Sequence, residues 1–174
     1  EGDIEKFCSS SISLTARTLS KECFDAIIEN AYSAVNAVEN NEVNESLEKV
    51  IEAIIYLSCV GFENGSLAAA HSIANSLSTI SKYNKFMHGE KVAFGTVVQL
   101  ILENKDAHLI DKVKELYKKI DLPYNMKQIG IEDEEELYQI AKRACEKDQP
   151  INRMKKIFAH EDKVKSAIKF TENL

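Results

Sequence analysis

Two histidines in the middle of the chain are the residues whose type and setting could support chemistry. His71 follows three alanines in the stretch GFENGSLAAAHSIANS, residues 61–76. A helix that opens at Ser66 places His71 on its inward face together with Ala70 and Ala74. An imidazole in that position is either a core residue with satisfied hydrogen bonds or a metal ligand.

His88 stands 17 residues further on, directly before the stretch GEKVAFG. Gly89 removes bulk beside its imidazole, and Gly95 costs a helix about 1 kcal/mol relative to alanine, which is usually accepted for close packing. The spacing is not a zinc motif of the H-E-x-x-H kind, so it leaves both a shared metal site and simple helix capping open. His108 and His160 fall near polar helix starts and are most simply surface or capping residues.

The apolar spacing around these histidines predicts helices and no convincing strand. We expect a second helix, capped by Asn44 or Ser46 and ended by Gly61, that is buried because its apolar stripe is broad. The other expected helices cover about 13–39, 66–80, 89–103 and 110–117, with one more after the acidic cluster 132–136 and a last one from about 160. The sequence therefore predicts an all-α fold, a compact domain of about six or seven helices.

Composition limits the classes of protein that fit. A length of 174 residues suits one domain, and two prolines with six glycines favour helices. The net charge of -6 argues against a nucleic-acid partner, and no apolar stretch is long enough to cross a membrane. The scattered cysteines, Cys8, Cys23, Cys59 and Cys145, read as reduced small hydrophobic residues, so we expect a soluble, cytoplasmic protein.

The stretches GFENGSLAAAHSIANS and HGEKVAFGTVVQLILE resemble the helical domain of iron-containing (group III) alcohol dehydrogenases, and among them glycerol dehydrogenases. The likeness continues upstream through IEAIIYLSCVGFENG and downstream through LPYNMKQIGIEDEEELYQIAKRAC. Members of that family have an amino-terminal α/β domain that binds NAD and a carboxy-terminal helical domain that helps to hold a divalent metal. The resemblance implies that residues 1–174 are the helical metal-binding domain of a longer protein, without the α/β nucleotide domain, which fits a chain that begins without methionine.

The resemblance also implies the roles of individual residues. His71 and His88 match the two histidine ligands of the family, whose third ligand is an aspartate in the domain that is absent here. Two imidazoles and a carboxylate suit zinc or iron(II). Phe62 matches an aromatic residue that lines the substrate pocket, although ordinary core packing explains it equally well. The implied activity is NAD-dependent oxidation of a small polyol or alcohol to a ketone, in a homo-oligomeric enzyme, with this chain inactive alone.

The sequence departs from the family pattern in two places. Ala74 and Ser76 replace a histidine and a glycine of the motif HAIHNG, and QPINRM at residues 149–154 stands where the family tends to ETIHNM. A different polyol or small alcohol is therefore plausible. Two alternatives stay open: a non-catalytic helical interaction module, and a lyase of the dehydroquinate synthase type or a phosphopolyol dehydrogenase. A phosphate substrate would need basic residues, and the motif region offers only Lys82, Lys85 and Lys91.

Overall fold

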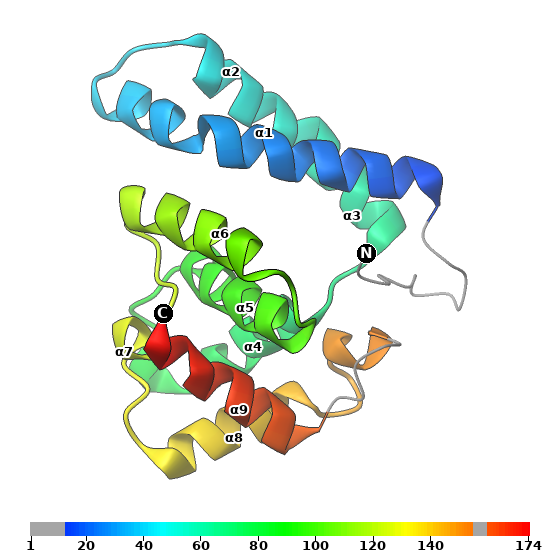
Figure 1. Cartoon of the computed structure of the whole chain (residues 1–174), viewed down its shortest axis with the longest axis vertical. Helices are drawn as coiled ribbons and strands as arrows, with labels where there is room; N and C mark the ends of the chain where they lie inside the picture. The colour runs from blue at the N-terminus through cyan, green and yellow to red at the C-terminus, as the bar shows by residue number, and fades with distance from the viewer. Residues whose placement is uncertain (1–12, 155–159) are drawn as a thin grey trace.

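The computed structural model describes residues 13–154 and 160–174, which form helices and turns without a β-strand (Figure 1). The expected all-α class is confirmed. In chain order the α-helices are α1 (Leu14–Glu39), α2 (Glu45–Glu52), α3 (Cys59–Gly65), α4 (Ala69–Ser78), α5 (His88–Leu102), α6 (Ala107–Lys119), α7 (Met126–Ile129), α8 (Glu134–Ala144) and α9 (Glu161–Phe170). The short elements are the π-helix η1 (Ala53–Ser58) and the 3-10 turns η2 (Ser81–Tyr83), η3 (Pro150–Arg153) and η4 (Thr171–Asn173).

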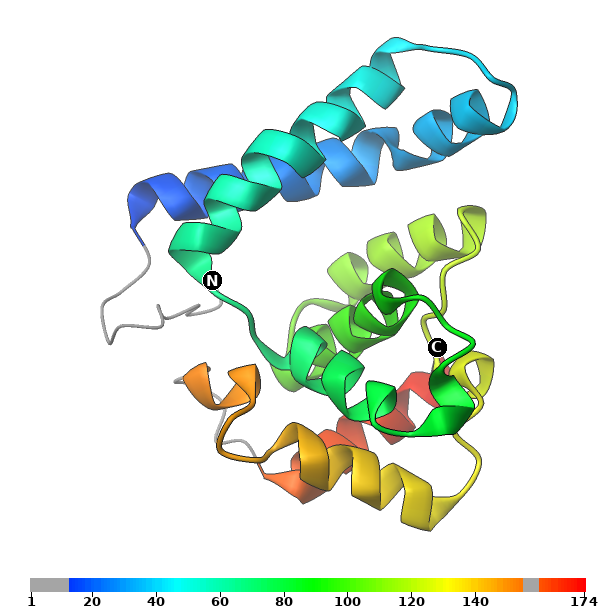
Figure 2. The ribbon, with the colours of Figure 1, turned by 180° about the vertical axis from the view of Figure 1, so that it is seen from behind.

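The first three α-helices form a long antiparallel hairpin, in which α2, η1 and α3 run back along α1 (Figures 1 and 2). Ser13 caps α1 by accepting a hydrogen bond from the Ala16 amide, and Asn44 caps α2 by accepting one from the Leu47 amide. The residues buried along the hairpin are mainly alanines: Ala16, Ala31, Ala34, Ala37 and Ala53. The hairpin packs against the rest of the molecule through α1 and α6.

The expectation that the second helix is buried is wrong. Ile51, Ile54 and Tyr56 are 46 %, 55 % and 65 % exposed, and no residue of α2 is buried. The reason is that this helix has α1 on one side only, while its apolar stripe is too broad for one partner to cover. Gly61 does not end the helix either: it lies inside α3, where an added Cβ would come within 3.1 Å of the Ser20 hydroxyl oxygen.

The remaining helices enclose the main hydrophobic core. Its largest fully buried side chains are Ile73, Leu77, Tyr83, Phe94, Ile129, Ile131, Leu137, Ile140, Ile151 and Ile168. Helix α4 is central to this core, because it contacts α5, α8 and η3. None of the described helices has the length and apolar character that a membrane span requires.

Polar residues determine where α8 begins, as expected, whereas α4 begins at a different residue than expected. Asp133 accepts a hydrogen bond from the Glu136 amide and the next three residues are acidic, so the acidic cluster is a helix cap, as predicted. Helix α4 begins at Ala69 rather than at Ser66, because Ser66 has φ +70° and cannot belong to a helix.

Candidate metal centre

Helices α4 and α5 approach each other so closely that one residue between them must be glycine. A Cβ added at Gly95 would lie 2.3 Å from the Ala70 carbonyl oxygen and 3.0 Å from the Ala70 Cα, distances that real Cβ atoms do not tolerate. At the same crossing the Ala70 amide donates to Gln99 Oε1 at 2.9 Å. The predicted use of Gly95 for close packing is confirmed.

A buried lysine fixes the far end of the same helix pair. Lys91 lies one turn beyond His88 in α5 and is only 6 % exposed. Its Nζ donates to Ser78 Oγ at 3.1 Å, and that hydroxyl donates in turn to the Ala74 carbonyl at 2.8 Å. Because Ser78 ends α4, the ammonium group lies near the negative end of that helix. The two helices are thus held at both ends of α4.

This helix pair brings His71 and His88 together. Their ring centroids are 5.7 Å apart and their planes are inclined by 53°. Two imidazoles bound to one zinc ion, at the usual metal–nitrogen distance, have centroids about 5–6 Å apart, so the separation fits a shared ion. His71 is half-buried in α4, whereas His88 is exposed as the first residue of α5.

The environment of His71 favours its neutral form. Burial lowers the pKa of its imidazole, and the neighbouring His88 lowers the pKa further. A neutral ring offers a free nitrogen lone pair, which is the form that binds a metal. The described residues contain no group of three or more His, Cys, Asp or Glu side chains that could hold an ion, so the pair would need a ligand from elsewhere.

The other histidines, Phe62 and the cysteines are not part of the histidine pair. His160 caps α9, where its Nδ1 accepts from the Asp162 amide at 3.3 Å, and His108 is exposed in the first turn of α6. Phe62 is 48 % exposed on α3, so it is not a core residue, and its predicted place beside a substrate stays a prediction. Cys23, Cys59 and Cys145 are free thiols, whereas Cys8 lies outside the described residues.

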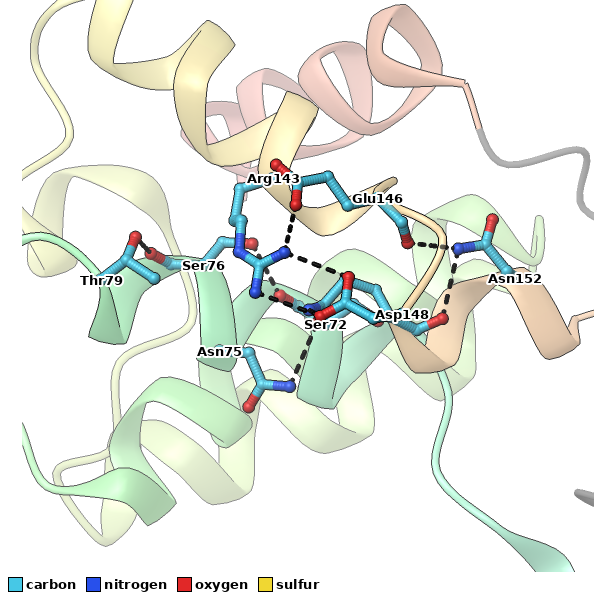
Figure 3. A network of polar contacts seen from close by, with 9 residues as sticks. Ser72, Asn75, Ser76, Thr79, Arg143, Glu146, Asp148 and Asn152 are labelled. Carbon is cyan, nitrogen blue, oxygen red and sulfur yellow. Dashed lines mark hydrogen bonds and ion pairs between the residues drawn. The ribbon is translucent and has the colours of Figure 1, made fainter.

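The two stretches that depart from the family pattern lie against each other (Figure 3). The Ile151 amide of η3 donates to Ser72 Oγ of α4 at 2.8 Å, across 79 residues of sequence. One turn further along α4, Asn75 Nδ2 donates to Gln149 Oε1 at 3.1 Å. Ala74 and Ser76 are themselves fully buried. The contacts of α4 with the segment 149–154 are thus made by Ser72 and Asn75, which flank the changed Ala74.

An ion pair between Arg143 and Asp148 connects the end of α8 to the residues that lead into the segment 149–154. Arg143 donates through both terminal nitrogens to the carboxylate of Asp148, at 3.1 and 3.2 Å, and also contacts Glu146. The hydrogen bonds from Arg143 lower the pKa of Asp148. Gln149, which is buried, joins the pair because its Nε2 donates to Asp148 Oδ2 at 3.1 Å.

Sequence reasoning did not single out Asn75, Gln149 or the burial of Lys91. A signal was present for two of them. Asn75 stands four residues after His71 and Lys91 three residues after His88, spacings that place each beside a histidine on a helix surface. Gln149 stands in the stretch 149–154 that departs from the family pattern, but its contact with Asn75 had no signal, because the two residues are 74 positions apart.

Comparison with known proteins gives consistent results, although no family model matches the chain. A glycerol dehydrogenase of Thermotoga maritima is 37 % identical over 142 residues, which are 80 % of this chain and 39 % of the relative. One from Escherichia coli is 40 % identical over 141 residues, 80 % of this chain and 38 % of the relative. The chain thus spans about two fifths of the curated relatives that it matches.

The fold agrees with that relationship. The crystal structure of glycerol dehydrogenase from Schizosaccharomyces pombe superimposes with a TM-score of 0.88 at 33 % identity, covering 97 % of this chain and 43 % of that one. A probable glycerol dehydrogenase from Sinorhizobium meliloti gives a TM-score of 0.86 at 30 % identity, covering 93 % and 48 %. By sequence and by fold, this chain is a homologue of the helical carboxy-terminal part of glycerol dehydrogenases, which confirms the resemblance seen in its sequence.

Proposed function

We propose that this chain is the metal-binding helical part of an NAD-dependent polyol dehydrogenase that oxidises a secondary alcohol, such as that of glycerol, to a ketone. The observation that carries this proposal is the 5.7 Å separation of the His71 and His88 rings on two helices that are locked together. The relationship to glycerol dehydrogenases supports the choice of reaction.

In this proposal His71 and His88 are two ligands of a divalent ion, zinc or iron(II), and an aspartate of a separate α/β domain is the third. Such an ion acts as a Lewis acid that lowers the pKa of a bound alcohol. The residues of this chain position the ion: the α4–α5 contact fixes the distance between the rings, and burial keeps His71 neutral. NAD binds to the α/β domain, so this chain alone binds metal weakly and has no turnover.

Further parts of the proposal concern the surroundings of the reaction. Phe62, which is exposed on α3, lines the substrate pocket between this part and the α/β domain. The complete enzyme is a homo-oligomer. The free thiols of Cys23, Cys59 and Cys145 support a cytoplasmic location.

Metal binding tests the proposal directly. Cobalt(II) added to the chain should give visible absorption bands of an ion bound by imidazole nitrogen, and the His88→Ala variant should lose them while its far-ultraviolet circular dichroism stays unchanged. His108→Ala is the matched control, because His108 is an exposed histidine on another helix. Equal cobalt spectra for His88→Ala and for the unaltered chain would refute the ligand assignment and favour the non-catalytic interaction module.

A further inference from the structure

Helix α4 has a single polar stripe that is open to solvent. Ser72, Ile73, Ala74, Ser76 and Leu77 are all buried. Between them His71 is half-buried, while Asn75 and Ser78 are exposed. His71 and Asn75 are four residues apart, so their side chains are neighbours on the same face of the helix. A molecule bound at the histidine pair would therefore have Asn75 beside it.

The amide group of Asn75 is held in one orientation. Its Nδ2 donates to Gln149 Oε1 at 3.1 Å. Gln149 cannot reverse its own amide without loss, because its Nε2 already donates to Asp148 Oδ2 at 3.1 Å. Arg143 donates two hydrogen bonds to the same Asp148 carboxylate. Arg143 thus fixes the carboxylate of Asp148, the carboxylate fixes which end of the Gln149 amide donates, and Gln149 fixes which end of the Asn75 amide donates.

The consequence is a hydrogen-bond acceptor on an exposed side chain. Because Nδ2 is bound to Gln149, the oxygen Oδ1 lies on the other side of the Asn75 amide group, which Figure 3 draws as sticks. No group in the described ranges donates a hydrogen bond to Oδ1. Gln149 itself is only 4 % exposed, so its role is limited to orienting Asn75.

We propose that Asn75 is a substrate-binding residue, whose Oδ1 accepts a hydrogen bond from a second hydroxyl group of the polyol, and that Gln149 is its positioning residue. This inference rests on the proposed function. A polyol differs from a simple alcohol by having a hydroxyl group next to the reacting carbon, and a fixed neutral acceptor recognises that group. The contact would thus select polyols over monohydric alcohols without changing the charge near the metal ligands.

A comparison of two substrates tests this proposal in the complete enzyme. Asn75→Leu, which keeps the branched shape of the side chain but removes its polar atoms, should lower kcat/KM for glycerol by about 10- to 100-fold, chiefly through KM. The kcat/KM for 2-propanol, which has no second hydroxyl group, should change less than about twofold. Gln149→Met should reproduce part of the glycerol effect, because Asn75 loses its orientation. Gln139→Leu on the exposed side of α8 is the control and should change neither substrate.

A second readout does not depend on turnover. In the zinc-loaded chain, the side-chain amide resonance of Asn75, identified by its loss in Asn75→Leu, should shift on addition of glycerol and not of 2-propanol. Metal-induced shifts of the His71 and His88 ring protons report separately on the proposed function. Glycerol and 2-propanol affected equally by Asn75→Leu, or glycerol unaffected, would overturn the assignment of Asn75 even where metal binding is intact.

Discussion

The close contact of α4 with α5 makes Gly95→Ala the most informative single change. The added Cβ would lie 2.3 Å from the Ala70 carbonyl oxygen, and real Cβ atoms do not come closer than 3.0 Å, so α4 must retreat by about 0.7 Å. The atom in the way belongs to the backbone of a buried helix. No side-chain rotation can therefore relieve the clash.

The expected loss of stability follows from three terms. Overpacking in a core costs about 1–3 kcal/mol. The weakened hydrogen bond from the Ala70 amide to Gln99 costs about 1 kcal/mol, and the better helix propensity of alanine returns about 1 kcal/mol. The net destabilisation is thus about 1–3 kcal/mol.

Urea unfolding followed by circular dichroism measures this difference. Gly89→Ala is the matched control, because Gly89 lies in the same helix and an added Cβ there meets nothing within 4 Å. We expect Gly89→Ala to be neutral or slightly stabilising, and Gly95→Ala to weaken cobalt binding as well, since the histidine rings separate. A Gly95→Ala variant as stable as Gly89→Ala would refute the account of the α4–α5 contact.

Three other predictions concern different parts of the molecule. Ser72→Ala leaves a buried backbone amide of η3 without its acceptor, so the free energy of unfolding in urea should fall by about 1–3 kcal/mol, whereas Ser166→Ala on the exposed side of α9 should have little effect. Hydrogen bonds from two lysines of α9 lower the pKa of Glu134 from 4.5 to about 2, so the folded state holds its proton less tightly. Their contribution to stability is present above about pH 4.5 and lost as the pH falls towards 2, and the small stability difference between Glu134→Gln and the unaltered chain should disappear over that range in acid titrations of unfolding. Burial raises the pKa of Cys145 to about 11, so at pH 8 a thiol reagent followed by mass spectrometry should label the exposed Cys59 first, and equal rates would contradict the burial of Cys145.

Much of the fold could be predicted from local sequence. The range of α1 and the capping role of Asn44 follow from apolar spacing and from a side chain that satisfies free amides. The short helix α7 was not predicted, although Asn125 and Gln128 form a capping box at its start. The second helix was misjudged because a stripe of apolar residues reports which side chains are hydrophobic and not how many partners are present to cover them.

The candidate site shows the same division. Gly95 could be understood from its cost to a helix, and the histidines could be singled out from their neighbours. Spacing along the chain could not establish that the rings of His71 and His88 meet, because that depends on how two helices cross. The contact between Ser72 and the Ile151 amide depends in the same way on tertiary packing across 79 residues.

The buried alanines between α1 and the helices that run back along it have a consequence for the order in which parts of the protein unfold. Alanine methyl groups bury little apolar area per residue. The main hydrophobic core, from α4 onward, is instead stabilised by isoleucine, leucine, tyrosine and phenylalanine side chains. Amide protons of α1 and α2 should therefore exchange with deuterium well before those of α4 and α5. Proteases should cut first at the exposed bend around residues 40–43. They should leave a resistant fragment that contains His71 and His88.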